Sequence, residues 1–423
     1  MQVVILAQHD SICLRQLTTT GVIGQLPLAS LGLVLSNLVQ IFHSAGVTNP
    51  LILCRPGQTS QLEKCLPKST GAIFIEISPS LSIPECLYRI RDRFTATGCC
   101  QYVFLTYADL VVTEFDIRRL FLKMVRTRAA IVALMAPYST DPKFVKVARG
   151  GHDLMLIDTE DESLVMFTPV TDLKKQVRVP KSVVATHTHL VSRADLHDVG
   201  FYLLSGYALR LLEYNRDEIG LRKGFLKHIV NTEQYKPYQF DTSSIYISDL
   251  PEELRYSPDD LPKSAKVAIV IHQDKAVCRR LDSPLSYLDA VKLVHEKYPS
   301  EKNEKCSSGG GGGGGGHKTP ISDTIQGEEC VFGSGVLVRS CILGARCRVG
   351  ESARLLSSVL LSGVTIGDGC KITNCVIGEG VTIDDNCTLK DCTVAARQHV
   401  PAKSLMHSEN LGFSEIDFDE LSV

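Results

Sequence analysis

The chain has 423 residues, more than one ordinary domain holds, so two or three domains are expected. Its 45 basic and 47 acidic side chains leave a formal net charge of −2, and a broad electrostatic grip on nucleic acid is therefore not expected. No run approaches the roughly 18 apolar residues that cross a bilayer, and the short apolar start lacks the basic region of a secretory signal. These features predict a cytosolic protein without membrane contact.

Fifteen cysteines raise the question of disulfide bonds. The chain is large, shows no secretory signal and contains no pair of cysteines separated by two residues. Because disulfides are rare in such proteins, we expect free, reduced thiols.

The first half of the chain alternates between strand-like and helix-like segments. Short apolar runs are typical of strands buried on both faces, and longer segments carry apolar residues at helical spacing. Gly46 follows the first such helix and predicts its end. The alternation predicts an α/β, Rossmann-like domain with a mostly parallel sheet over residues 1–244. The predicted strands are residues 3–7, 51–53, 102–106 and 129–134, and the predicted helices are residues 28–45 and 114–125.

A connector is predicted over residues 245–306. It begins with a segment rich in Pro, Asp, Glu and Ser, continues with two strand-like runs, 266–272 and 276–280, and ends with a helical segment, 286–296. Eight consecutive glycines then occupy positions 309–316. A phosphate-binding loop would interleave other residues and lead into a helix, so residues 307–318 are interpreted as a flexible linker.

Aliphatic residues recur at nearly every sixth position after this linker. A period of six fits neither an amphipathic helix nor a half-buried strand, but it is typical of a β-helix built from hexapeptides. Three hexads close one triangular coil, so residues 319–405 predict a left-handed parallel β-helix of roughly four coils. Residues 406–423 form an acidic tail that can cap the last coil, dock on a partner or remain solvated. The inward positions are Ile325, Val331, Leu337, Leu343, Val349, Leu355, Leu360 or Leu361, Ile366, Ile372, Ile377, Ile383 and Leu389.

Five cysteines fall in one slot of this repeat, two residues before the inward position. A metal site is one interpretation, but the spacing typical of zinc sites is absent. The slot otherwise holds alanine or valine, which favours cysteine as a small apolar filler. The five are Cys341, Cys347, Cys370, Cys375 and Cys387.

An α/β domain followed by a left-handed β-helix resembles the sugar-nucleotide pyrophosphorylases and their relatives. Within them the chain looks most like the gamma-subunit family of translation initiation factor 2B, the guanine-nucleotide exchange factor for initiation factor 2. The segments that carry this likeness are residues 3–7, 102–109, 164–173, 183–189, 196–203 and 266–280. The resemblance implies a subunit that pairs with a catalytic epsilon subunit, acts on initiation factor 2 as part of a complex, and has little exchange activity alone.

The same resemblance bears on catalysis. Active relatives carry a glycine-rich loop after the first strand and a lysine shortly beyond it. Here Gln8, His9 and Asp10 follow the first strand, and no lysine precedes Lys64. Side chains would obstruct the close backbone approach of a triphosphate, and Asp10 would repel it. We therefore expect a degenerate nucleotidyltransferase domain with no catalytic residue, cofactor or metal.

Three residues nevertheless match positions of a vestigial nucleotide pocket. Arg15 survives from the family's loop, Asp109 is a candidate magnesium ligand, and Asp198 is a candidate second ligand. Asp109 has a simpler interpretation, because Asp often ends a strand and caps the following turn. His187 and His189 have alternate spacing on one strand face, but two ligands without a third favour a surface role.

Two other functions fit parts of the sequence. An active or regulatory sugar-nucleotide pyrophosphorylase of the mannose-1-phosphate guanylyltransferase type has the same architecture, although the loop after the first strand opposes activity. A hexapeptide acyltransferase would need a histidine between coils, and His399, at the far edge, is the sole histidine of the predicted β-helix. Such enzymes also lack the large α/β domain.

Overall fold

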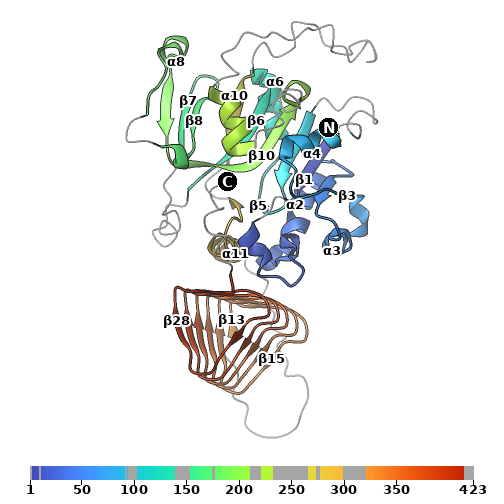
Figure 1. The fold of residues 1–423 in the computed structure, drawn as a ribbon, viewed down its shortest axis with the longest axis vertical. Helices are drawn as coiled ribbons and strands as arrows, with labels where there is room; N and C mark the ends of the chain where they lie inside the picture. Colours follow the sequence, from blue (N-terminus) through green and yellow to red (C-terminus); the bar gives the residue numbers. More distant parts are fainter. Residues whose placement is uncertain are drawn as a thin grey trace.

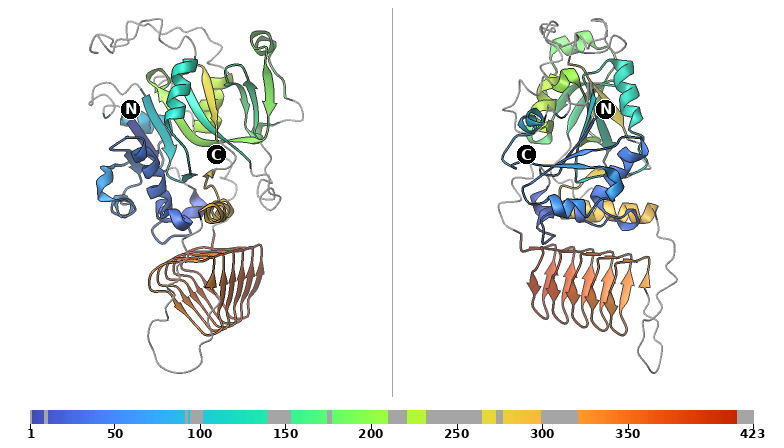
Figure 2. Two further views of the ribbon diagram at one scale, coloured as in Figure 1. Left: turned by 180° about the vertical axis from the view of Figure 1, so that it is seen from behind. Right: turned by 90° about the vertical axis from the view of Figure 1, so that its right-hand side faces the viewer.

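The computed structural model describes residues 2–8, 11–90, 93, 102–138, 153–173, 177–209, 221–231, 265–272, 277–298 and 321–413. These residues form an α/β domain and a β-helix that lies against one end of it (Figures 1 and 2). Among the described residues, no helix is both long and apolar enough to cross a membrane. The glycine tract 309–316 and the residues after Phe413 lie outside the described part of the chain.

The α/β domain is organised around a mixed sheet, whose described strands run in the order β3-β2-β1-β4-β10-β6-β11-β8-β7-β9. The strands from β3 to β4 are parallel, as are β6 and β11, whereas β10 is antiparallel to both of its neighbours. The bounds are β1 (Gln2–Leu6), β2 (Leu51–Cys54), β3 (Ile73–Glu76), β4 (Tyr102–Tyr107), β6 (Ile131–Pro137), β7 (Leu154–Asp158), β8 (Ser163–Thr168), β9 (Leu190–Arg193), β10 (Leu196–Ser205) and β11 (Val267–Ile271).

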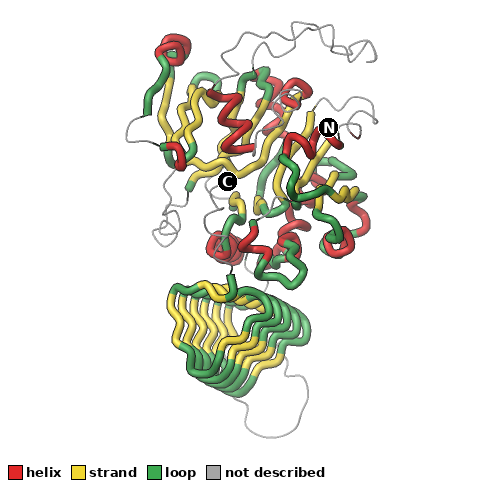
Figure 3. The backbone as a smooth tube through the Cα atoms, in the orientation of Figure 1, coloured by secondary structure: helices red, strands yellow, loops and turns green. Residues whose placement is uncertain are grey.

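Helices cover both faces of this sheet (Figure 3). On one face, α2 (Val34–Ser44) and α6 (Arg118–Thr127) pack on alternate residues of the central strands, around Phe42, Phe104 and Phe201. On the other face lie α4 (Ile83–Arg89) and α10 (Lys227–Asn231). Gly46 lies just after α2 and has a φ of +79°, a left-handed conformation that ends the helix as predicted. The remaining short helices are α1 (Ile12–Arg15), η1 (Ile23–Gln25), η2 (Ala29–Leu31), α3 (Thr59–Glu63), η3 (Lys68–Thr70), η4 (Val170–Asp172), α8 (Lys181–Thr186) and η5 (Leu221–Leu226).

The strand-like runs assigned to a connector belong instead to the α/β domain. The first, β11, lies inside the large sheet, with every residue from Val267 to Ile271 in parallel register with β6. The second, β12 (Cys278–Arg280), pairs antiparallel with β5 (Leu110–Val112) directly after β4. A boundary at residue 244 was therefore wrong for these strands, because strands distant in sequence are recruited to complete a sheet.

The β-helix is confirmed, and it is longer than predicted. Its described strands stack in three parallel sheets of six, six and five strands, so it has more than the expected four coils (Figure 2). It runs to β29 (Asn410–Leu411), into the segment predicted as tail. The strands are β13 (Ile321–Ser322), β14 (Ile325–Gln326), β15 (Val331–Phe332), β16 (Leu337–Arg339), β17 (Ile342–Leu343), β18 (Arg348–Val349), β19 (Arg354–Leu356), β20 (Val359–Leu360), β21 (Thr365–Ile366), β22 (Lys371–Thr373), β23 (Val376–Ile377), β24 (Thr382–Ile383), β25 (Thr388–Lys390), β26 (Thr393–Val394), β27 (His399–Val400), β28 (Leu405–His407) and β29.

Each coil contains 17 residues rather than three equal hexads, as the pairing of Ile372 with Leu389 shows. One side of the triangular coil therefore has five residues instead of six. A strict period of six that is continued across this side points to the residue next to the true inward one.

This slip explains why three early predictions were wrong. Ile325 is the register partner of the outward Ile342 and packs with the cluster around α11. Val331 is 60% exposed, and Leu337 is only half-buried beside the fully buried Val338.

The repeat cysteines point into the coils or their corners, where their thiols meet backbone carbonyls. Sγ of Cys347 donates to the carbonyl of Leu361 at 3.2 Å, and Sγ of Cys375 donates to that of Thr373 at 3.1 Å. Ser358 fills the equivalent corner one coil before Cys375 and donates to Leu356. These contacts give the thiols a packing role in the β-helix core.

Candidate functional site

The carboxyl ends of β1 and β4 lie side by side at the edge where parallel α/β sheets bind ligands. Leu6 and Tyr107 are register partners at these ends, and the amide of Ala108 donates to the carbonyl of Leu6 at 3.0 Å. The segments that follow both strands therefore start from one point, and the candidate residues lie around it.

Asp109 lies at this edge, and its carboxylate forms an ion pair with Arg280. The pairing of β12 with β5 places Arg280 opposite Leu110, and its Nε lies 3.1 and 3.3 Å from the two carboxylate oxygens of Asp109. The Asp109 side chain is fully buried, and the backbone carbonyl of Asp109 accepts a hydrogen bond from the amide of Leu281. An ion pair of this kind satisfies the carboxylate internally, on the side where a cation would otherwise bind.

Arg280 also stacks on an aromatic ring. Its guanidinium carbon lies 3.6 Å from the ring centroid of Tyr107, a cation–π geometry. Burial opposes the charged form of Arg280, but the charges of Asp109 and Tyr107 outweigh it and raise the pKa of the guanidinium. Burial raises the pKa of Asp109, and Arg280 offsets part of that effect.

Asp198 also lies close to Tyr107. Its carboxylate accepts hydrogen bonds from the amide of Gly200 at 2.9 Å and from the hydroxyl of Tyr202. The strand β10 bulges between Asp198 and Tyr202, and this irregularity turns the carboxylate back on its own chain. Burial raises the pKa of Tyr107, and the nearby Asp198 and Asp109 act in the same direction against Arg280. The structure therefore brings both predicted carboxylates around one buried tyrosine.

The loop after β1 contains a buried side chain where relatives need open backbone. Gln8 is fully buried. Its side-chain Nε2 donates to Sγ of Cys86 at 2.8 Å, and its backbone carbonyl accepts a hydrogen bond from Arg55 at 2.6 Å. His9 and Asp10, the other two residues of the predicted obstruction, lie outside the described residues.

Arg15 lies on a different element from the two carboxylates. It ends α1, a short helix held by Ser11, whose hydroxyl donates to the carbonyl of Asp282 at 2.7 Å. The adjacent Leu14 and Leu17 pack against side chains of the β-helix and of α11 (Pro284–Lys297). The helix that carries Arg15 thus belongs to the junction between the two parts of the molecule.

Arg280 is the functional residue that sequence reasoning missed. It falls in the predicted strand 276–280, but its relation to Asp109 depends on a pairing across 171 positions of sequence. The one local signal was the pair Arg279 and Arg280 in a short strand. Because neighbouring residues of a strand point to opposite faces, one of the two must face inward.

The two histidines of the alternate pair have separate partners. Nδ1 of His187 lies 2.8 Å from the carboxylate of Asp158, and His189 lies beside Thr188 and, at 3.7 Å, Glu160. His187 follows α8 and is mostly buried, whereas His189 is 65% exposed. His187 therefore makes a local hydrogen bond to Asp158, whereas His189 lies at the surface.

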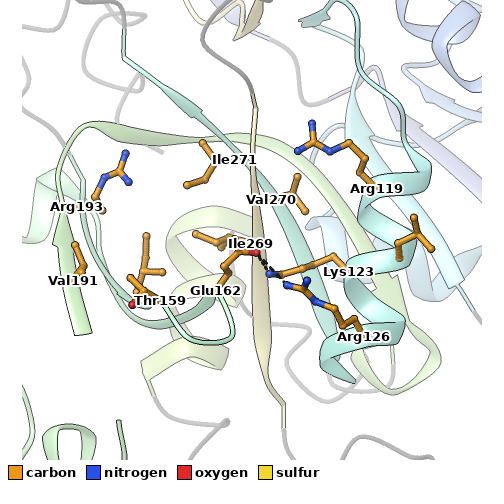
Figure 4. A pocket seen from close by; sticks show the side chains of 12 residues that line it. Arg119, Lys123, Arg126, Thr159, Glu162, Val191, Arg193, Ile269, Val270 and Ile271 are labelled. Atoms are coloured by element: carbon orange, nitrogen blue, oxygen red, sulfur yellow. Dashed lines mark hydrogen bonds and ion pairs between the residues drawn. The ribbon is translucent and has the colours of Figure 1, made fainter. Parts of the chain in front are cut away.

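A separate groove of about 470 Å³ lies on the α6 side of the sheet. Its floor is formed by β11, and Arg119 and Arg193 approach it from opposite walls (Figure 4). Lys123 and Arg126 are tied to Glu162 in the same groove. Arg193 is in turn paired with Asp195, so most of the cations here are already neutralised.

The structure thus consists of an α/β domain with a mixed sheet joined to a left-handed parallel β-helix. Residues 318–410 match the family described as the GMPPB C-terminal domain. The chain is also similar to translation initiation factor eIF2B subunit gamma of Dictyostelium discoideum, with 22% identity over 169 residues. That match spans 37% of this chain and 37% of the relative. Both similarities agree with the resemblance predicted from the sequence.

Proposed function

We propose that the chain is a non-catalytic structural and regulatory subunit of the guanine-nucleotide exchange factor for translation initiation factor 2, acting in the cytosol. In this role it pairs with a catalytic epsilon subunit and stimulates GDP release from the substrate factor. The similarity to an eIF2B gamma subunit supports the assignment to this complex. The observation that carries the non-catalytic part is the buried Asp109–Arg280 ion pair.

The ion pair opposes catalysis for an electrostatic reason. Nucleotidyl transfer uses carboxylates to hold a divalent cation that offsets charge on the triphosphate. Magnesium at Asp109 would have to displace Arg280 from a buried contact with both carboxylate oxygens and with the Tyr107 ring. Breaking such a pair costs about 3–5 kcal/mol. The residue that would position the cation is thus committed to the packing of β12 on β5.

The assignment to the exchange complex is tested by reconstitution with a candidate epsilon subunit. The two proteins are mixed at micromolar concentration and sized, and GDP release from initiation factor 2 is then followed with each subunit alone and with both. We expect one co-eluting complex, no release by this chain alone, and faster release with both subunits than with epsilon alone. Separate elution at that concentration would reject the proposal.

A sugar-nucleotide pyrophosphorylase of the mannose-1-phosphate guanylyltransferase type is the second candidate, and the GMPPB match of the β-helix favours it. The discriminating measurement is pyrophosphate release from GTP or UTP with a sugar 1-phosphate and magnesium, beside an active guanylyltransferase as positive control. We expect no turnover. Release above the no-enzyme blank that Asp109→Asn abolishes, in protein that melts as the native chain does, would establish this function instead.

A further inference from the structure

A column of small polar side chains fills one corner of the β-helix, the corner that precedes β17, β20, β23 and β26. Its members follow one another at the coil length of 17 residues and are Cys341, Ser358, Cys375 and Cys392. All four are buried, and each donates its thiol or hydroxyl to the backbone carbonyl two residues earlier, at distances between 2.8 and 3.2 Å. Each coil therefore holds its member of this corner column in the same orientation.

The last two members of the corner column are both cysteines, and they lie on neighbouring rungs. Val376 and Thr393, the residues that follow them, are register partners. The amide of Cys392 donates to Sγ of Cys375 at 3.4 Å. Rungs lie about 4.8 Å apart, and the Cα atoms of disulfide-bonded cysteines are usually about 4.4–6.8 Å apart. A bond between the two sulfurs therefore requires only a local adjustment of the chain.

The two thiols also interact with each other. A hydrogen bond from the Cys375 thiol lowers the pKa of Cys392 to about 6, although burial and the charge of Glu409 act in the opposite direction. The same hydrogen bond raises the pKa of Cys375. Cys341, which is followed in the column by Ser358, has its pKa raised to about 11 by burial. Because the thiolate is the nucleophilic form, Cys392 is the reactive member of the corner column at neutral pH.

Cys392 lies one coil from the end of the described stack (Figure 2). The next position of the column is Glu409, which is exposed, and Leu405 in the same last coil is 80% exposed. A terminal coil is packed on one side only, so it opens more readily than an interior coil. Opening of this single coil uncovers Cys392, whose exposed fraction in the closed β-helix is 2%.

We propose that Cys375 and Cys392 form a site of reversible oxidation, at which a hydroperoxide converts the two thiols into a disulfide between neighbouring coils. The bond fixes the coil that contains Cys392 to the coil before it and limits opening of the β-helix from this end. The site is independent of the exchange function proposed above.

The reaction takes two steps. The Cys392 thiolate attacks the terminal oxygen of the hydroperoxide, so that an S–O bond forms, the O–O bond breaks, and the alkoxide leaves and takes a proton from water. Sγ of Cys375 then attacks Sγ of the sulfenic acid, so that the S–S bond forms and the oxygen leaves as water with the Cys375 proton. The two sulfurs give up two electrons and the peroxide gains them. A dithiol reverses the change by thiol–disulfide exchange.

Disulfide mapping in the full chain tests the proposal. Reduced protein is freed of reductant, treated with hydrogen peroxide, blocked with N-ethylmaleimide in denaturant and digested. Cleavage after Lys and Arg combined with cleavage before Asp places each cysteine of these two coils on its own peptide. We expect residues 372–383 to be linked to residues 391–397 in native protein, severalfold faster than in urea, and the link to disappear with dithiothreitol.

Serine variants assign the two roles. Cys392→Ser should abolish the link, whereas Cys375→Ser should leave Cys392 as a sulfenic acid that dimedone captures. Cys341→Ser, in the same corner column, is the matched control and should form the link at the native rate. Ser358 shows that serine fits the column, so all three variants should fold, and thermal melts check this.

Other outcomes overturn the proposal. A link that forms only in urea would show that the native coils keep the two sulfurs apart. A native link between Cys370 and Cys387, which stack at another corner, would place the reactive pair there. A link between isotopically labelled and unlabelled copies would make the bond intermolecular. Should a serine variant fail to fold, the map of the native chain still decides the question.

Discussion

The carboxylate of Glu379, on the β-helix, accepts hydrogen bonds from both the backbone amide and the hydroxyl of Thr19, at 2.8 and 2.6 Å. The backbone amide of Glu379 in turn donates to the carbonyl of Leu17 at 2.8 Å. A second backbone contact, from the amide of Ala396 to the carbonyl of Gln16, lies one coil further along. The segment that follows α1 is therefore fixed to successive coils of the β-helix.

Removal of this carboxylate should weaken the junction. Hydrogen bonds to a charged group contribute about 1.5–3 kcal/mol each, so Glu379→Ala should lower the free energy of unfolding by about 1–3 kcal/mol after relaxation. Urea unfolding followed by circular dichroism measures the change. Glu351→Ala, at an exposed site on another coil, is the matched control and should change stability by less than about 0.5 kcal/mol. Equal effects would show that Glu379 does not hold the junction.

Loss of Arg280 should destabilise the α/β domain. Arg280→Ala leaves the Asp109 carboxylate buried without its cation, which should cost about 3–5 kcal/mol. Arg118→Ala removes an exposed pair with Asp116 and should leave the stability nearly unchanged. Thermal melts of both variants provide the comparison. Restored stability in R280A/D109N would identify the uncompensated charge as the cause, and a near-neutral Arg280→Ala would refute the structural role.

Gly200 is required beneath the Tyr107 ring. Its φ is +74°, and a Cβ there would lie 2.6 Å from Cδ2 of Tyr107. Gly200→Ala should therefore cost about 1–3 kcal/mol through backbone strain and displacement of the ring. Gly57, also at positive φ but with open space around it, is the control for strain alone. A similar loss at both positions would mean that the ring contact contributes nothing.

Two β-helix thiols outside the Cys375–Cys392 pair should resist alkylation in the native protein. Burial raises the pKa of both Cys341 and Cys347 to about 11. Because the thiolate is the reactive form, a shift of the pKa from an ordinary value near 9 to about 11 leaves about a hundredfold less thiolate at pH 8. Iodoacetamide labelling with peptide mapping should show both protected relative to the half-buried Cys330, and labelled at equal rates in denaturant.

The same shift has a consequence for stability. A thiol whose folded pKa exceeds its unfolded value stabilises the native state below about pH 9, and that contribution is lost as the pH rises toward 11. The free energy of unfolding should therefore fall over this interval. Labelling of Cys347 as fast as Cys330 in native protein at pH 8 would contradict the burial.

The register of the first coils can be tested with a pair of neighbouring residues. Val331 is 60% exposed, whereas Phe332 faces the β-helix core. Val331→Asp should change stability by less than about 0.5 kcal/mol, and Phe332→Asp should cost several kcal/mol by placing a charge in the core. Melting temperatures measure both. The opposite ranking would show that Val331 rather than Phe332 points into the core, as a strict period of six requires.

Much of the fold follows from local patterns. The buried runs at β1, β2, β4 and β6 are apolar on both faces, which is why they read as strands of an α/β sheet. The β-helix was recognisable because one inward side chain recurs on each side of every coil. Its register failed where the shorter side of the first coil, from Val338 to Leu343, breaks the period of six.

The site depended on contacts that no local pattern contains. Asp109 was found because it ends the segment 102–109, and Asp198 because it lies near Gly200 within the segment 196–203; the structure places both close to Tyr107. Their actual state depends on Arg280, which is contributed by a strand pair formed far along the chain. Local sequence constrains the conformation of a residue, but the partner of a buried charge is chosen by tertiary pairing.

The coil of 17 residues has a consequence for how this protein can change in length. Insertion or loss of one entire coil moves everything beyond it by a single step of about 4.8 Å along the stack, without rotation. A single extra residue within a strand would instead turn every following inward side chain outward. The length of the β-helix can therefore change only by whole coils of 17 residues if the inward register is to be kept.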